Sequence, residues 1–89
     1  MKNTYLEVTF RKGRPFAAYL YLPRAAGVKS ARTKQVAPGI LVDFSSADDA
    51  IGIEITAPIQ VTAQQVNDAL KAIGLATVSP EDLAPLRAA

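Results

Sequence analysis

The sequence predicts a small α+β domain: an antiparallel β-sheet of about five strands, with a C-terminal helix packed on one face and a short second helix. Apolar and polar residues alternate through residues 4–57, as in strands with one buried face. Gly and Pro residues separate the alternating stretches. The apolar spacing then becomes helical within residues 62–87. At 89 residues, we expect one domain spanning residues 1–89.

The first two predicted strands, residues 4–10 and 16–22, form a hairpin around a Gly- and Pro-containing turn at residues 11–15. Pairing Phe10 with Phe16 brings the apolar residues of both strands to one face of the sheet. That agreement favours this register.

The two most apolar strands are predicted at residues 40–44 and 51–56, joined by a polar loop at residues 45–50. Pairing Phe44 with Ile51 again places all their apolar side chains on one face. These two strands are therefore expected to form the centre of the core.

The preceding strand, residues 31–37, does not alternate in the same way. Regular pairing would point Thr33 and Gln35 at the core unless a β-bulge intervenes. It would also place Lys34 opposite Asp43. We expect this strand to lie at an edge of the sheet.

The helical segment carries recognisable start and stop signals. Thr62 and Gln65 form a capping box, and Gly74 is placed to end the helix. Ser79 and Pro80 suit the start of a second short helix. The first helix has an apolar stripe made of Val66, Leu70 and Ile73.

The composition excludes several kinds of chemistry. There are no cysteines and no histidines, which removes disulfides, structural zinc sites and Ser-His or Cys-His catalysis. We expect a non-enzymatic protein without a cofactor. The N-terminus lacks the apolar run of a signal peptide, and no stretch resembles a transmembrane helix. A cytoplasmic bacterial protein that does not enter a membrane is the expectation.

Charge is unevenly distributed along the chain. Residues 1–34 hold eight of the ten Lys and Arg residues and one acid, whereas residues 35–89 hold seven of the eight acids. This asymmetry suggests a surface for nucleic acid or an acidic partner. Charges at loops and strand edges also have a plain structural explanation, because they discourage aggregation. The candidate nucleic-acid contacts are Arg11, Lys12, Arg14, Tyr19 and Tyr21.

Two carboxylates, Asp43 and Glu54, project from the same face of adjacent predicted strands, diagonal to one another. Such a pair can perform acid–base chemistry or bind a hard cation. An ion pair between Asp43 and Lys34 across the strands explains the same residues without a ligand.

Several apolar side chains are predicted on the face of the sheet that points away from the core. A contiguous apolar patch on a small domain often marks an interface, which suggests a homo-oligomer, most simply a dimer. The second helix folding back over the patch is the alternative. The candidate interface residues are Tyr5, Tyr19, Tyr21, Val36 and Leu41.

Residues 18–22, 33–44 and 51–55 carry short motifs, among them Pro38-Gly39 and Ile-Gly-Ile-Glu-Ile. They resemble a family of small bacterial domains of unknown function with the signature P-G-(V/I)-x-x-D-(Y/F) followed by (V/I)-G-I-E-I. The chain departs from this family at Gln35, where an acid is usual, and lacks its Asp-Gly hairpin turn. The resemblance implies the fold and no particular activity.

The motif residues also have a structural interpretation. Pro38 and Gly39 suit the central positions of a type II turn, and Gly52 allows a bulge or a close approach opposite Asp43.

The leading hypothesis is therefore a non-enzymatic protein-interaction module that self-associates. The alternative is a nucleic-acid-binding accessory protein that uses the basic N-terminal hairpin. A carboxylate-based enzyme or small-ligand sensor is the third and weakest hypothesis.

Overall fold

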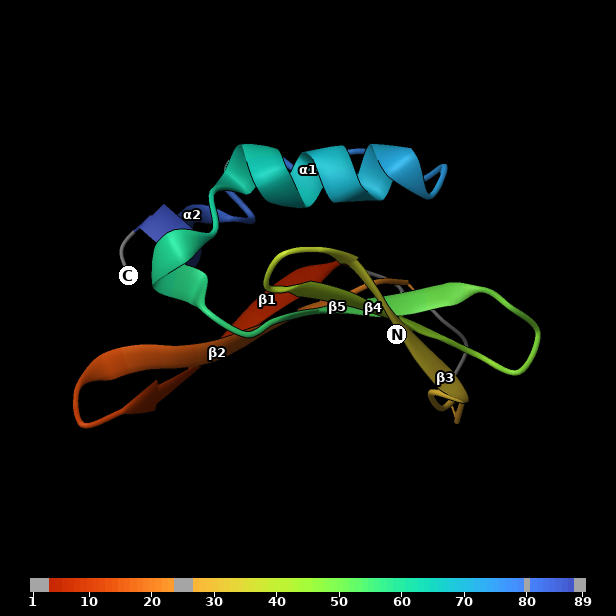
Figure 1. Cartoon of the computed structure of the whole chain (residues 1–89), viewed down its shortest axis with the longest axis horizontal. Helices are drawn as coiled ribbons and strands as arrows, with labels where there is room; N and C mark the ends of the chain where they lie inside the picture. Colours follow the sequence, from red (N-terminus) through yellow and green to blue (C-terminus); the bar gives the residue numbers. More distant parts are fainter. Residues whose placement is uncertain (1–3, 24–26, 80, 88–89) are drawn as a thin grey trace.

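The computed structural model describes residues 4–23, 27–79 and 81–87 (Figure 1). It confirms the predicted α+β fold: five antiparallel strands form one sheet in the order β1-β2-β5-β4-β3. The strands are β1 (Tyr5–Arg11), β2 (Arg14–Tyr21), β3 (Arg32–Ala37), β4 (Ile40–Phe44) and β5 (Ala50–Ile55). The helical elements are the 3₁₀ turn η1 (Pro58–Gln60), α1 (Ala63–Ala72) and α2 (Ala84–Arg87).

The hairpin of β1 and β2 turns through only two residues, Lys12 and Gly13. Both have positive φ angles, 53° and 75°, the combination found in type I′ hairpin turns. Arg11 and Arg14 face each other directly on either side of this turn. Figure 1 shows the hairpin extending past the helical layer, so its turn lies away from α1 and α2.

The predicted register of this hairpin is confirmed along most of its length, but the observed pairing differs near the turn. Val8 lies opposite Ala18 as expected, whereas Phe10 pairs with Pro15 instead of Phe16. A bulge between Thr9 and Phe10 causes the difference. Alternation of apolar residues does not reveal such an extra residue, because it changes the pairing only locally.

A similar shift occurs between β4 and β5. Val42 lies opposite Ile53 as predicted, but Phe44 pairs with Ala50 and not with Ile51. The loop that follows β4 is organised by Ser45, whose Oγ accepts the backbone N–H groups of Ala47 and Asp49 at 3.2 and 3.3 Å.

β3 contains a bulge, the alternative left open by its sequence pattern, located between Gln35 and Ala37. Thr33 therefore lies opposite Asp43, and Lys34 lies opposite Val42. The expected pairing of Lys34 with Asp43 is wrong, because the extra residue reverses the faces of the strand.

The first helix begins and ends where the sequence predicts. Thr62 and Gln65 form the capping box, with Gln65 N–H donating to Thr62 Oγ1 at 3.1 Å and Thr62 N–H donating to Gln65 Oε1 at 2.8 Å. Gly74 follows the helix with a φ of 80°, and Leu75 N–H donates to Leu70 O at 2.9 Å. These bonds satisfy helix ends that would otherwise lack partners.

The second helix differs from its prediction. Ser79 still caps a turn, since its Oγ accepts from Asp82 N–H at 3.3 Å, but α2 begins only at Ala84. Pro80 lies outside the described residues. The short η1 turn, which carries Pro58 at its start, has no counterpart in the predicted elements.

α1, α2 and η1 all lie on one side of the sheet (Figure 1). Between these two layers lies the core, which is apolar and includes fully buried residues from both. Its most buried members from the sheet are Leu20, Ile40, Val42, Ile53 and Ile55. Those from the helical side are Val66, Leu70 and Leu83. Burial of these side chains is the main source of stability in a two-layer domain.

Candidate functional site

The side of the sheet opposite α1 and α2, which we call the open face, displays two rows of side chains across all five strands. Antiparallel pairing places residues of neighbouring strands opposite one another within each row. The first row contains Tyr5, Tyr21, Gly52, Asp43 and Thr33. The second contains Glu7, Tyr19, Glu54, Leu41 and Gln35. Among the described residues, no helix covers this face (Figure 1).

A hydrogen-bonded bridge crosses the middle of the open face. Tyr19 on β2 reaches across β5, and its Oη donates to Asp43 Oδ2 on β4 at 2.7 Å. Thr33 on β3 donates its Oγ1 to the other oxygen, Asp43 Oδ1, at 2.5 Å. The Asp43 carboxylate thus joins three strands through side-chain bonds alone.

The bridge exists because residue 52 is glycine. Gly52 lies between Tyr21 and Asp43 in its row, and a Cβ atom added there would overlap the Tyr19 ring. The close approach anticipated at Gly52 is therefore real, and it accommodates an aromatic ring. Sequence patterns alone did not identify Tyr19 as its occupant.

The three tyrosines form one cluster on β1 and β2. The rings of Tyr5 and Tyr21 stack at 4.4 Å with an interplanar angle of 17°, and those of Tyr19 and Tyr21 meet edge to face at 4.7 Å. Tyr21 Oη also donates to Glu7 Oε1 at 3.3 Å. Tyr5, at the outer edge, remains 45% exposed.

The proposed carboxylate pair, Asp43 and Glu54, does lie diagonally on adjacent strands. The two groups differ in their surroundings, however. Asp43 is half-buried and accepts two hydrogen bonds, while Glu54 is exposed and receives no hydrogen bond or ion pair from the described part of the chain. In residues 4–23, 27–79 and 81–87, no group of three acids, His or Cys is positioned to hold a metal ion.

Two residues predicted on or near this face lie elsewhere. Val36, named as a candidate interface residue, packs against the core cluster because it is the bulged residue of β3. Lys34 likewise projects opposite Val42, on the side of the sheet that carries the helices. Four of the candidate interface residues remain together on the open face: Tyr5, Tyr19, Tyr21 and Leu41.

The predicted nucleic-acid contacts are divided between two places. Arg11, Lys12 and Arg14 surround the hairpin turn, which we call the hairpin tip, and all three are exposed. Tyr19 and Tyr21 lie on the open face, Tyr19 being about 17 Å from Arg14 along β2 at the usual rise per strand residue.

Two exposed phenylalanines accompany the hairpin tip. Phe10 and Phe16 are 61% and 54% exposed, and the Arg11 guanidinium lies over the Phe16 ring at 5.5 Å. Aromatic and basic side chains are thus combined at the tip itself. The sequence pattern had assigned both phenylalanines to the core side of the hairpin, without indicating that the helical layer stops short of them.

Another basic residue of the N-terminal third, Arg32, does not extend this cluster. Arg32 lies on β3, at the opposite edge of the sheet from β1, where it pairs with Asp48 at 3.0 Å and lies over the Phe44 ring at 4.4 Å. Arg11, Lys12 and Arg14 therefore do not form one continuous surface with Arg32.

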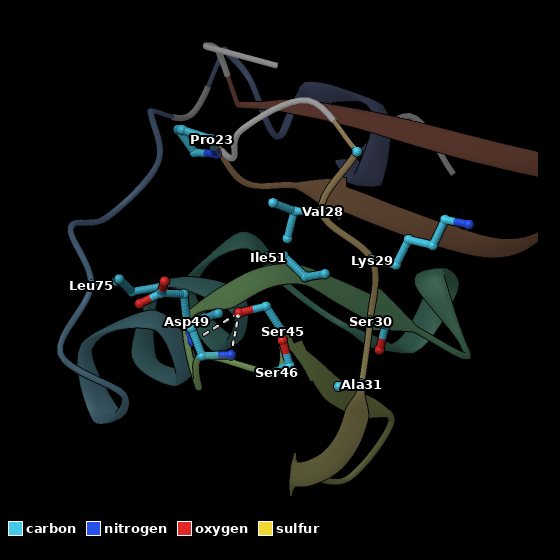
Figure 2. Close-up of a pocket in the computed structure, with 13 residues that line it drawn as sticks. Pro23, Val28, Lys29, Ser30, Ala31, Ser45, Ser46, Asp49, Ile51 and Leu75 are labelled. Carbon is cyan, nitrogen blue, oxygen red and sulfur yellow. Dashed lines mark hydrogen bonds between the residues drawn. The ribbon is translucent and has the colours of Figure 1, made fainter.

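A hollow of about 740 Å³ lies near the β4–β5 loop (Figure 2). Its walls include Pro23, Lys29, Ser46 and Leu75, and Figure 2 shows the Ser45 oxygen already engaged by backbone N–H groups of its own loop. None of the candidate site residues lines this hollow.

Among the described residues, no helix combines the length and apolar character needed to cross a membrane. Comparison with family models, curated proteins and solved structures finds no match to this chain. Its function is therefore inferred from its own residues.

Proposed function

We propose that this protein is a non-enzymatic protein-interaction module that self-associates through the open face of its sheet, most simply as a dimer. The observation that carries the proposal is the tyrosine cluster on a sheet face without a helical cover. Tyrosines supply large contact area together with a polar end, and are enriched at protein interfaces for that reason.

The hydrogen bonds of the open face support a binding role over a catalytic one. Asp43 is held between Tyr19 and Thr33, so each of its oxygens already accepts a hydrogen bond that braces the sheet. A braced face loses little conformational entropy when a partner covers it, which favours association.

The test is self-association of the wild type and of Tyr5→Ser, measured by sedimentation over a range of concentrations. Tyr5 is the most exposed tyrosine of the cluster on an edge strand. Truncating a tyrosine at the centre of an interface, where binding energy is concentrated, costs about 2 kcal/mol or more, so the variant should associate at least about tenfold more weakly.

Ile59→Ser is the matched control. Ile59 is also exposed and apolar, at 61%, but lies on η1 on the helical side of the sheet. It should associate like the wild type. A wild-type chain that stays monomeric at about 1 mM, or equal weakening by both substitutions, would contradict the proposal.

Binding of single-stranded nucleic acid by the hairpin tip is the second candidate function. The supporting observation is the combination of three exposed cations with the exposed rings of Phe10 and Phe16. Such pairing of charge with stacking surfaces is typical of sequence-independent binding to single strands. Phe10 and Phe16 replace Tyr19 and Tyr21 as the stacking residues of this hypothesis, because the tyrosines share their face with three carboxylates.

This candidate predicts oligonucleotide binding that weakens steeply with salt. Three phosphate contacts correspond to a slope of about −2 in log K against log salt. Fluorescence anisotropy with a labelled single strand measures the slope, and Arg11→Ser/Arg14→Ser should reduce it. Unchanged binding in that variant would exclude the hairpin tip as the nucleic-acid site.

A further inference from the structure

We infer that the open face of one copy receives the hairpin tip of a second copy. The inference rests on the proposed self-association and specifies which surfaces meet. The occupant of the face is thus a second copy of this chain, entering with Arg11, Lys12 and Arg14.

The two rows of the open face carry charge of a single sign. They contain the carboxylates of Glu7, Asp43 and Glu54 and no Lys or Arg. Two such faces pressed together in a symmetric dimer would set acids against acids, which is unfavourable. A positively charged partner is better matched to this face.

Glu54 is the central anion of the face. It lies in the second row between Tyr19 on β2 and Leu41 on β4. Its exposed carboxylate has no hydrogen-bond or ion-pair partner among the described residues. A carboxylate beside an aromatic ring suits a guanidinium group, which can bond to the oxygens and stack on the ring.

The hairpin tip carries matching charge of the opposite sign, arranged at a cost to the hairpin. Arg11 and Arg14 are directly opposite one another, a like-charge pairing that destabilises antiparallel strands. Lys12 occupies a left-handed conformation better suited to Asn or Gly. Local stability does not explain this choice of residues, whereas a role for the charges in binding does.

The tip is also placed where a second molecule can reach it. The hairpin projects past the helical layer (Figure 1). The rings of Phe10 and Phe16 are exposed, and the Arg11 guanidinium lies over the Phe16 ring. These rings would add apolar contact area to the charge pairing. Aromatic and Arg side chains together are the composition typical of interface centres.

Each copy has one tip and one face, so two copies can exchange tips and make two equivalent contacts. A two-fold dimer of this kind closes on itself and leaves neither surface uncovered. The same contacts made without reciprocity would produce an open chain of molecules.

Charge reversal on each surface tests the inference. The tip variant is Arg11→Glu/Arg14→Glu, and the face variant is Glu7→Lys/Glu54→Lys. All four side chains are exposed, so both variants should fold, which circular dichroism checks. Alone, each variant sets like charges against like and should associate at least about tenfold more weakly than the wild type.

An equimolar mixture of the two variants gives the decisive result. In one contact, the basic tip of the face variant meets the acidic face of the tip variant. In the other contact, the acidic tip of the tip variant meets the basic face of the face variant. A mixed dimer should therefore form with an affinity near that of the wild type, detectable by native mass spectrometry.

The control variant is Lys29→Glu/Lys34→Glu, which changes the net charge by the same amount at exposed residues outside the tip. It should associate like the wild type. If instead this control weakens association as much as the tip variant does, net charge and not the tip is responsible, and the inference is wrong.

The remaining outcomes separate this inference from the proposed function. If the tip variant associates like the wild type while Tyr5→Ser does not, the open face mediates self-association but does not bind the tip. A monomeric wild type would overturn both. Wild-type association that disappears after nuclease treatment would overturn the tip–face contact in favour of nucleic-acid binding.

Discussion

At residue 52, the ring of Tyr19 passes over the backbone of β5 to reach Asp43. We expect Gly52→Ala to displace this ring and break the bond to Asp43, lowering the free energy of unfolding by about 1–2 kcal/mol. Urea denaturation measures the change. The Tyr19→Ser background supplies the control, because removing the ring leaves room for a methyl group.

In the Tyr19→Ser background, the effect of Gly52→Ala on the free energy of unfolding should reverse its sign. Gly52 does not have a positive φ, so alanine fits its backbone and reduces the entropy of the unfolded chain. Gly52→Ala should then be neutral or stabilising by up to about 1 kcal/mol. An equal destabilisation in both backgrounds would show that the close approach of Tyr19 is not the reason for glycine here.

Lys12 provides a second test at the scale of one residue. Its φ of 53° belongs to the left-handed region, where Asn is much better tolerated than Lys. Lys12→Asn should raise the free energy of unfolding by about 0.5–1 kcal/mol. Lys12→Gln, which removes the charge without favouring this conformation, should give less than half of that gain. If both substitutions raised the free energy of unfolding equally, the loss of the Lys12 charge, and not the backbone conformation, would be the cause.

Among the elements, strands and helix caps could be predicted from sequence more reliably than the pairing of strands near their ends. Alternation depends on which residues are apolar, so it identified all five strands and the central pairs such as Val42 with Ile53. Bulges depend on one extra residue whose side chain looks ordinary. The three bulges near Phe10, Val36 and Phe44 account for the errors in register.

The β3 bulge determines which residues of that strand are buried. Val36 packs against the core, whereas Gln35 is exposed on the open face. Val36→Asn should therefore lower the free energy of unfolding by about 1–2 kcal/mol more than Gln35→Asn does. Regular alternation would predict the opposite order. Thermal unfolding of the two variants distinguishes these alternatives.

Across the whole molecule, the sequence predicted the arrangement of the candidate surfaces only in part. It correctly grouped Tyr5, Tyr19, Tyr21 and Leu41, because alternation assigns faces within well-paired strands. It joined the tyrosines to the basic hairpin turn because both lie on the same two strands. Their separation depends on where the helical layer ends and on which side of the sheet it lies, and neither is encoded in any single strand.

The proposed self-association through opposite charges predicts an effect on the stability of the molecule as a whole. Because only folded chains associate, a hundredfold rise in protein concentration should stabilise each chain by about 1 kcal/mol in a dimer. For a domain of this size, that raises the melting temperature by about 5 °C. At about 0.5 M salt, screening should remove most of this shift, since exposed charges then interact only over a few ångströms.

The tip variant Arg11→Glu/Arg14→Glu should show almost no dependence of its melting temperature on concentration at either salt level, whereas Lys29→Glu/Lys34→Glu should behave like the wild type. Differential scanning calorimetry at two concentrations and two salt levels measures all of these. A shift that persists undiminished at high salt would mean that apolar contact dominates, because the burial of apolar surface is not weakened by screening. The tyrosine cluster, and not the charged tip, would then carry the association.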